Sequence, residues 1–167
     1  MSLSAAVLSR RSLLLAAMAG VFGSLWRPQP VLAASKAGDP SWDLTADQWR
    51  ELLSSQAYEV LRNEGTERPF TSSLNGEKRS GTYHCAGCDA ALFSSEAKFD
   101  SGTGWPSFWQ PLDEAIATKV DFKLILPRTE YHCSRCGGHQ GHVFNDGPRP
   151  TGKRYCNNGV ALRFQPA

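Results

Sequence analysis

The sequence predicts a mainly β fold, and three observations support this class. A helical spacing of apolar residues is confined to positions 46–62. After it come short apolar and β-branched segments separated by glycine and proline, as is typical of antiparallel strands. Two Cys-x-x-Cys pairs lie among these segments. We therefore expect antiparallel β-sheets around a zinc-stapled core, with one or two helices on the N-terminal side.

The first element of this fold is an amphipathic helix, which we expect over residues 46–62. Thr45 and Gln48 form a capping-box pattern, and Leu44 is placed to pack on Trp49 as a hydrophobic staple. The positions with helical apolar spacing are Trp49, Leu52, Leu53, Val60 and Leu61. Gly65 is expected to end the helix, because glycine readily follows a helical C-terminus.

The rest of the chain alternates between turn signals and segments with the composition of strands. Asn75-Gly76 is a strong turn signal. The segments predicted as strands are 81–83, 122–126, 142–144 and 159–164. The frequent glycine and proline between them favour short connections and antiparallel pairing.

Four of the five cysteines form two pairs that repeat each other. The pairs read Tyr83-His84-Cys85-Ala-Gly-Cys88 and Tyr131-His132-Cys133-Ser-Arg-Cys136. Two such knuckles supply the four thiolates of a tetrahedral structural zinc site. We therefore expect one zinc ion on Cys85, Cys88, Cys133 and Cys136. Because 44 residues separate the pairs, the metal would join distant parts of one domain.

Alternative interpretations of the cysteine pairs remain open at this stage. Two disulfides could form in an exported protein. A thioredoxin-like redox pair is a further alternative, although no βαβ pattern surrounds either Cys-x-x-Cys. His84 and His132, beside the first cysteine of each pair, could be additional ligands, but we expect ordinary strand residues.

The N-terminus has the pattern of an export signal. Arg10-Arg11 stands directly before an apolar run that continues to Phe22, and Val31-Leu32-Ala33 offers small residues for cleavage. We expect a twin-arginine signal peptide over residues 1–33, a linker over 34–41 and one domain over 42–167. The protein would then be exported, to the periplasm of a bacterium. A general secretory signal or an organelle transit peptide are the alternatives.

The charge balance argues against polyanionic partners. The chain has 18 basic and 16 acidic residues, and three arginines lie in the first 33 positions. Without them the charge is about −1. No basic face remains to favour nucleic acid or an anionic membrane. The apolar run of the leader is too short and interrupted for a spanning helix, so we expect no membrane anchor.

The fifth cysteine has no partner in the two pairs. Cys156 lies in Arg154-Tyr-Cys-Asn-Asn158. If this segment is a strand, Arg154 and Asn158 share a face with Cys156. A lone thiol with a cation beside it is a candidate nucleophile, because a neighbouring positive charge lowers a thiol pKa.

Several segments beyond the cysteines complete a recognisable pattern. They are Gly65-Thr-Glu-Arg-Pro-Phe70, Gly104-Trp-Pro-Ser-Phe108, His139-x-x-His142-Val-Phe144, Asp146-Gly-Pro148 and Arg154-Tyr-Cys-x-Asn158. With both knuckles, in this order, the chain resembles the B-type peptide methionine sulfoxide reductases from about residue 42 to 166. The resemblance implies a β-tent-like, monomeric, zinc-containing enzyme. It would reduce methionine-R-sulfoxide in oxidised proteins and peptides to methionine.

The resemblance also implies roles for individual residues. Cys156 would be the nucleophile, and His139 and His142 would handle the proton that the sulfoxide oxygen takes up. The other residues assigned to catalysis are Asn158, to orient the oxygen, and Arg154. The side chains expected to hold the substrate methyl group are Trp105, Phe108 and Phe144. Asp146 is expected to form a turn, although Arg154 could instead pair with a carboxylate.

One position departs from the family pattern. Many members have a second redox cysteine in a Ser-Gly-Cys-Gly-Trp-Pro segment, where this chain has Thr103. A sulfenic acid on Cys156 would then need an external reductant, either a small thiol or a thioredoxin-like donor. Rescue by a knuckle cysteine is an alternative that would damage the metal site.

Two functions other than catalysis are also compatible with parts of the sequence. An exported zinc-ribbon-like binding module would explain the knuckles and the aromatic residues, but not Cys156 beside Arg154. An inert secreted domain held by disulfides would explain the cysteine pairs alone.

Overall fold

The structure is a computed structural model and describes residues 39–167 of the 167-residue chain. The expected signal peptide over 1–33 and most of the linker over 34–41 lie outside these residues. Among the helices of residues 39–167, none has the length and apolar character needed to cross a membrane.

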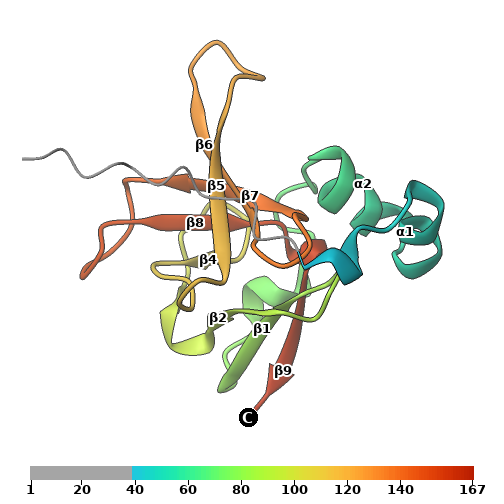
Figure 1. Ribbon diagram of the computed structural model, residues 1–167. Coiled ribbons are helices and arrows are strands. Elements are labelled where there is room, and N and C mark those ends of the chain that lie inside the picture. Colours follow the sequence, from blue (N-terminus) through green and yellow to red (C-terminus); the bar gives the residue numbers. More distant parts are fainter. Residues whose placement is uncertain (1–38) are drawn as a thin grey trace, which may run out of the picture. The chain divides into compact units, whose positions relative to one another are not determined.

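Two antiparallel sheets form the body of the described chain (Figure 1). The first has the order β2-β1-β9, with bounds Ala91–Ser94, Gly81–Cys85 and Leu162–Pro166. The second has the order β3-β4-β8-β7-β6-β5, with bounds Lys98–Phe99, Ser107–Phe108, Arg154–Asn157, His139–Phe144, Arg128–Cys133 and Ile116–Asp121. Four short 3-10 helices connect elements, at Pro40–Trp42, Ser73–Gly76, Ser95–Ala97 and Gly159–Ala161. The predicted mainly β, antiparallel class is confirmed.

The predicted single helix is two helices, α1 at Ala46–Leu52 and α2 at Ser55–Asn63. Its expected capping box is present, with the Thr45 and Gln48 side chains each accepting the other's backbone N–H. The helix breaks because Ser54 acts as a new N-cap: its hydroxyl accepts the Ala57 amide at 3.2 Å. α2 is ended by Glu64, which adopts the left-handed conformation one position before the expected glycine.

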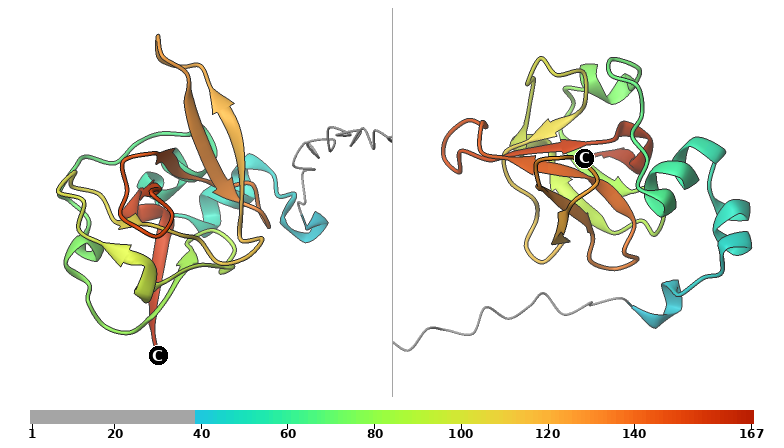
Figure 2. Two further views of the ribbon diagram at one scale, coloured as in Figure 1. Left: turned by 90° about the vertical axis from the view of Figure 1, so that its left-hand side faces the viewer. Right: turned by 90° about the horizontal axis from the view of Figure 1, so that it is seen from above.

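The strand predicted over 122–126 is wrong. β5 ends at Asp121 and β6 begins opposite it at Arg128, so these residues form the tip of a hairpin. The Asp121 carboxylate accepts the Lys123 amide at 2.8 Å, an Asx turn that ends β5. Pro127, which has no amide hydrogen, stands at the return. Figure 2 shows this hairpin extending away from the other strands.

The hydrophobic core lies between the sheets and α2. Phe93 and Phe108 stack with ring centroids 4.2 Å apart, and Tyr83 meets Phe108 edge-on at 4.9 Å. Phe108 is 0% exposed, so its expected contact with substrate is wrong. Its position on β4, opposite Tyr155, places the ring in this aromatic cluster.

Candidate active site

The two Cys-x-x-Cys knuckles have the same backbone geometry. Cys85 ends β1 and Cys133 ends β6. In each knuckle the amide four residues on, of Asp89 or Gly137, donates to the carbonyl of the first cysteine at 2.9 Å. Both of these residues adopt the left-handed conformation, with φ of 61° and 67°. The repeat seen in the sequence is therefore a repeat in structure.

The four knuckle cysteines meet in one buried cluster. Their sulfurs all lie within 4.8 Å of one another. Cys85 and Cys136 have Sγ atoms 3.7 Å apart, and Cys88 and Cys133 have Sγ atoms 3.5 Å apart. A tetrahedron with metal–sulfur bonds of about 2.3 Å has edges of about 3.8 Å, so the cluster fits one zinc ion. No disulfide occurs between the cysteines of residues 39–167, which argues against the disulfide interpretation.

Cys156 lies on the wall of a separate cavity of about 260 Å³. It is on β8, opposite Ser107 of β4 and His142 of β7. Gly141 allows this packing, since a Cβ there would lie 1.9 Å from the Cys156 carbonyl oxygen. The cavity is lined by Thr66, Thr103, Trp105, Arg128, Gly141, His142, Phe144, Arg154, Cys156, Asn157 and Asn158. The structure thus brings together most of the residues that the sequence singled out.

The pKa of the Cys156 thiol departs from expectation. Burial raises it above the ordinary value, while the charge of Arg154 and hydrogen bonds from Thr103 and Arg154 act in the opposite direction. The positive charge of Arg154 is itself compensated, because its guanidinium donates to both oxygens of Asp146 at 2.9 and 2.8 Å. The expected lowering of the thiol pKa by Arg154 is therefore outweighed by burial.

Arg154 also shapes the apolar side of the cavity. Its guanidinium carbon lies 4.4 Å from the centre of the Phe144 ring, a cation–π contact. Asp146, expected only to form a turn, is the carboxylate that holds Arg154 in place. Phe144 and Trp105 are the two aromatic side chains on the cavity wall.

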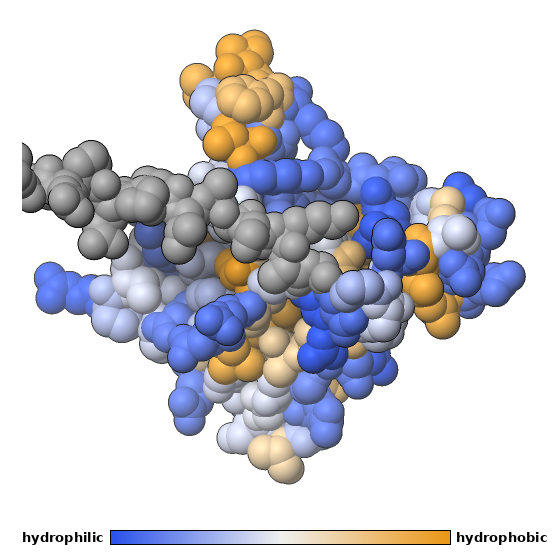
Figure 3. Space-filling model, viewed as in Figure 1, coloured by the Kyte–Doolittle hydropathy of each residue, from blue (hydrophilic) through white to orange (hydrophobic). Residues whose placement is uncertain are grey.

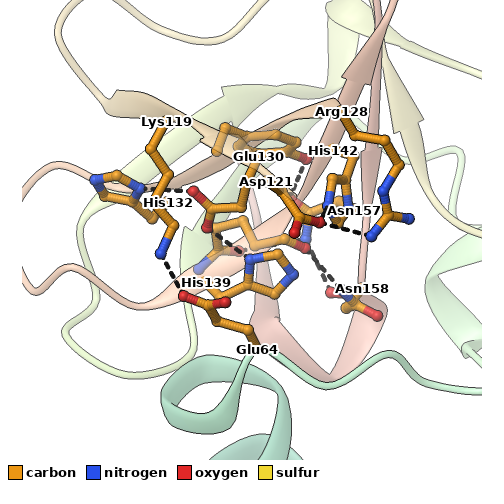
Figure 4. A network of polar contacts seen from close by, with 12 residues as sticks. Glu64, Lys119, Asp121, Arg128, Glu130, His132, His139, His142, Asn157 and Asn158 are labelled. Carbon is orange, nitrogen blue, oxygen red and sulfur yellow. Dashed lines mark hydrogen bonds and ion pairs between the residues drawn. The ribbon is translucent and has the colours of Figure 1, made fainter. Parts of the chain in front are cut away.

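His142 faces the cavity and is fixed by the β5–β6 hairpin (Figure 4). Its Nε2 donates to the Asp121 carboxylate at 2.8 Å, and Arg128 donates to the same oxygen at 2.6 Å. The Lys123 amide, His142 and Arg128 together hold the pKa of Asp121 well below its usual range. Burial lowers the pKa of His142, with Asp121 opposing. In neutral His142 the Nε2–H group donates to Asp121, and Nδ1 is left free to accept and release a proton.

His139 lies behind His142 instead of lining the cavity. It is 2% exposed, and the two imidazole rings are 5.5 Å apart. Its Nδ1 donates to Glu130 at 2.6 Å, and Glu130 also accepts from His132 at 3.0 Å. Burial raises the pKa of Glu130, but these two hydrogen bonds outweigh it and hold the pKa at about 2. The expected contact of His139 with substrate is thus corrected to a position one layer deeper.

Asn158 and Trp105 are held by the segment around Glu67. The Glu67 amide donates to the Asn158 side chain at 3.0 Å, and its carbonyl accepts the Trp105 indole N–H at 3.1 Å. Asn158 donates in turn to the Gln140 carbonyl at 2.9 Å. The Asn158 carboxamide is therefore part of the frame of the cavity, and its action on substrate stays a prediction.

Four charged residues at the site were missed in the sequence: Glu67, Asp121, Arg128 and Glu130. One signal was available. Arg128, Glu130 and His132 alternate along one strand, which places three charged or titratable groups on one face. Such a face on a central strand favours a polar network.

The similarity to known proteins agrees with this geometry. The SelR domain family matches residues 53–166. The chain belongs to the B-type peptide methionine sulfoxide reductase family. The peptide methionine sulfoxide reductase MsrB of Pseudomonas putida (strain W619) is 54% identical over 125 residues, which cover 74% of this chain and 94% of that protein.

Relatives in a plant and in Methanosarcina are also similar to this chain. The chloroplastic peptide methionine sulfoxide reductase B1 of Oryza sativa subsp. japonica is 49% identical over 131 residues, or 77% of this chain and 61% of that protein. MsrB of Methanosarcina barkeri is 51% identical over 120 residues, or 71% of this chain and 84% of that protein. For a B-type peptide methionine sulfoxide reductase, the cavity at Cys156 is the candidate active site.

The geometry of the knuckles predicts that loss of one thiolate releases the metal. In Cys88→Ser we expect zinc content to fall from about one ion per chain to near zero, since a hydroxyl replaces a thiolate ligand. The melting temperature should fall by at least about 10 °C, because a structural zinc contributes folding free energy directly. Elemental analysis and calorimetry measure both. Cys156→Ser is the control and should keep the zinc; retained zinc in Cys88→Ser would contradict the assignment.

The burial of Cys156 predicts slow alkylation at neutral pH. The rate of iodoacetamide labelling, followed by peptide-level mass spectrometry across pH, should have its midpoint above about pH 8.5, the pKa of a free thiol. Arg154→Gln should move the midpoint higher, because it removes the one guanidinium that acts on the sulfur. Lys153→Gln, on an exposed neighbour that binds Asn145, should leave it unchanged. A midpoint below 7 in the unsubstituted protein would show that burial is not the dominant effect.

Proposed function

We propose that this chain reduces methionine-R-sulfoxide in proteins and peptides to methionine, with Cys156 as the nucleophile. The observation that carries the proposal is the position of Cys156 on the wall of a cavity that His142, Arg154, Trp105 and Phe144 also line. Family membership supports the reaction class. A binding module without catalysis would give this reactive arrangement no role.

The proposed reaction transfers the sulfoxide oxygen to Cys156. The thiol sulfur attacks the sulfoxide sulfur, the sulfur–oxygen bond of the substrate breaks, and the oxygen ends as a sulfenic acid on Cys156. The substrate gains two electrons and becomes a thioether, while the cysteine loses two. His142, held at Nε2 by Asp121, carries the proton to the departing oxygen through Nδ1.

The sulfenic acid is proposed to be reduced by an external thiol. A first thiol displaces water from Cys156 and forms a mixed disulfide, and a second thiol releases Cys156 and leaves as a disulfide. A small thiol or a thioredoxin-like donor can supply both sulfurs. The four knuckle cysteines are buried as a cluster, and their place on zinc removes them from this step. Zinc on four thiolates has no open position and supplies structure only.

The cellular location of the protein is proposed from the sequence. The twin-arginine signal over 1–33 would export the protein after folding, so that zinc is loaded where thiols stay reduced. The protein would act in the bacterial periplasm as a monomer, on oxidised proteins and peptides. The proposed export rests on Arg10, Arg11 and the apolar run after them, and the monomer and its substrates rest on the family resemblance.

The arrangement of the cavity predicts selectivity for one sulfoxide epimer. With the methyl group on Trp105 and the oxygen on His142, the third substituent can leave the cavity in one direction only. The mirror epimer would turn its oxygen to the aromatic wall and lose a hydrogen bond, which costs about 1–3 kcal/mol. With the R epimer as the one that the family resemblance implies, we expect kcat/KM to favour it by about 5- to 150-fold.

Chromatography of products from purified epimers measures this preference. Cys156→Ser should be folded, keep its zinc and lose turnover of both epimers, because a serine hydroxyl is a poor nucleophile for this step. Turnover in folded Cys156→Ser would refute the role of Cys156. Equal rates on the R and S epimers would refute the proposed substrate geometry.

Thr103 predicts the fate of the oxidised enzyme. Thr103 and Cys156 line the same cavity, so their side chains are near each other. Without reductant, a dimedone-reactive sulfenic acid should accumulate on Cys156. Thr103→Cys should instead form a disulfide with Cys156, and turnover with a thioredoxin-type donor should rise.

Thr103→Ser is the matched control and should behave like the unsubstituted protein. Intact-mass spectrometry distinguishes the two products, since a sulfenic acid trapped by dimedone adds mass and a disulfide removes two hydrogens. A disulfide between Cys156 and a knuckle cysteine during turnover, with zinc release, would overturn the external-thiol model.

A further inference from the structure

The tip of the β5–β6 hairpin carries apolar side chains in solvent. We define the apolar tip as residues 122–126. Ile125 is 101% exposed, Phe122 and Leu126 are each 76% exposed, and Leu124 is 58% exposed. Figure 3 shows these residues as an apolar group at the end of the hairpin. Contiguous exposed apolar residues of this kind mark an interaction site more often than isolated ones do.

The base of the same hairpin is part of the cavity wall. Asp121 and Arg128 are paired across β5 and β6, directly below the tip. Arg128 lines the cavity with Cys156, and Asp121 holds His142 (Figure 4). Leu126 and Ile125 are two and three residues from Arg128, so the chain between them spans at most roughly 7–11 Å. The apolar tip is therefore separated from a residue that lines the cavity by one short segment of chain.

The lysines around the tip are already paired. Lys119 and Lys123 both bind the Glu64 carboxylate at the end of α2, Lys123 at 2.8 Å. These ion pairs connect the hairpin to α2 and hold both ammonium groups beside the Glu64 carboxylate. The other side chains at the end of the hairpin are apolar, and they fit an apolar ligand better than a polar or ionic one.

We propose that the apolar tip binds the apolar residues that flank methionine sulfoxide in an unfolded polypeptide. This inference rests on the proposed function, because it assumes that the sulfoxide enters the cavity at Cys156. Methionine is among the residues most often buried in folded proteins, and the core segments that contain it carry other apolar side chains as well. When the segment is unfolded, one flank can lie along the hairpin while the sulfoxide occupies the cavity.

Other occupants fit the tip less well. Four apolar side chains offer less area than the roughly 800 Å² per partner that a stable dimer buries. An anionic lipid surface is bound by clusters of lysine and arginine, whereas Lys123 is the one basic residue of the tip and pairs with Glu64. Neither a second copy nor a membrane would use the connection between the tip and the cavity.

The test compares three substrates that each contain one methionine-R-sulfoxide. One is the N-acetylated amide of the amino acid. The others are two peptides of about twelve residues, with either leucine and valine or serine and glycine as flanks. We expect the unsubstituted protein to prefer the apolar peptide by about tenfold in KM, as burial of one or two aliphatic side chains allows.

The variant is Ile125→Ser combined with Leu126→Ser, and Leu52→Ser is the control. Leu52 is 60% exposed on α1, outside the hairpin. The double variant should lose the preference for the apolar peptide and reduce the small substrate with unchanged kcat/KM. The control should keep the preference.

If the double variant still reduces the small substrate and keeps the preference for the apolar peptide, the inference is overturned. No reduction of the small substrate by the unsubstituted protein would instead refute the proposed function. Vesicle binding or self-association that depends on Ile125 and Leu126, with no effect on peptide KM, would also overturn the inference in favour of a membrane or a second copy.

Discussion

The meeting of the two cysteine knuckles is the constraint on which the rest of the structure depends. Cys85 ends β1 of the three-stranded sheet, and Cys133 ends β6 of the six-stranded sheet, so the cluster connects the two sheets at one point. β7 begins three residues after Cys136, at His139. A series of side-chain hydrogen bonds continues from the cluster to β8. Gln140 donates to the Cys85 sulfur at 3.4 Å, and it accepts from Asn157, the residue beside Cys156, at 3.3 Å.

Because of this connection, the metal centre and the cavity are parts of one frame. Four thiolates on one zinc ion leave no open ligand position for a substrate. Their effect on catalysis is therefore through the register of β7 against β8, which puts His142 opposite Cys156. The carboxylates at the site serve the same purpose, since Asp121 orients His142 and Asp146 orients Arg154.

The sequence predicted the parts of this arrangement that depend on local patterns. The knuckles, the capping box at Thr45 and the lone thiol on a strand each need only a few neighbouring residues. The strand over 122–126 was predicted wrongly because an apolar run resembles a buried strand, and its exposure depends on where Asp121 ends β5. Phe108 was misplaced for a similar reason: whether an aromatic ring faces a cavity or the core depends on strand pairing, which puts Phe108 opposite Tyr155.

The raised pKa of Cys156 also follows from long-range packing, and it is compatible with the proposed reaction. Oxygen transfer from a sulfoxide to a neutral thiol consumes no proton overall, since the thiol hydrogen ends on the sulfenic acid. The proton has only to move from the sulfur to the oxygen inside the cavity. His142 lies opposite Cys156 with Nε2 committed to Asp121, so one free nitrogen suffices for this transfer. A thiol kept neutral by burial is also a weaker nucleophile toward oxidants, because the thiolate is the reactive form. In the proposed reaction, the site would therefore favour a substrate that brings the oxygen to accept the thiol proton.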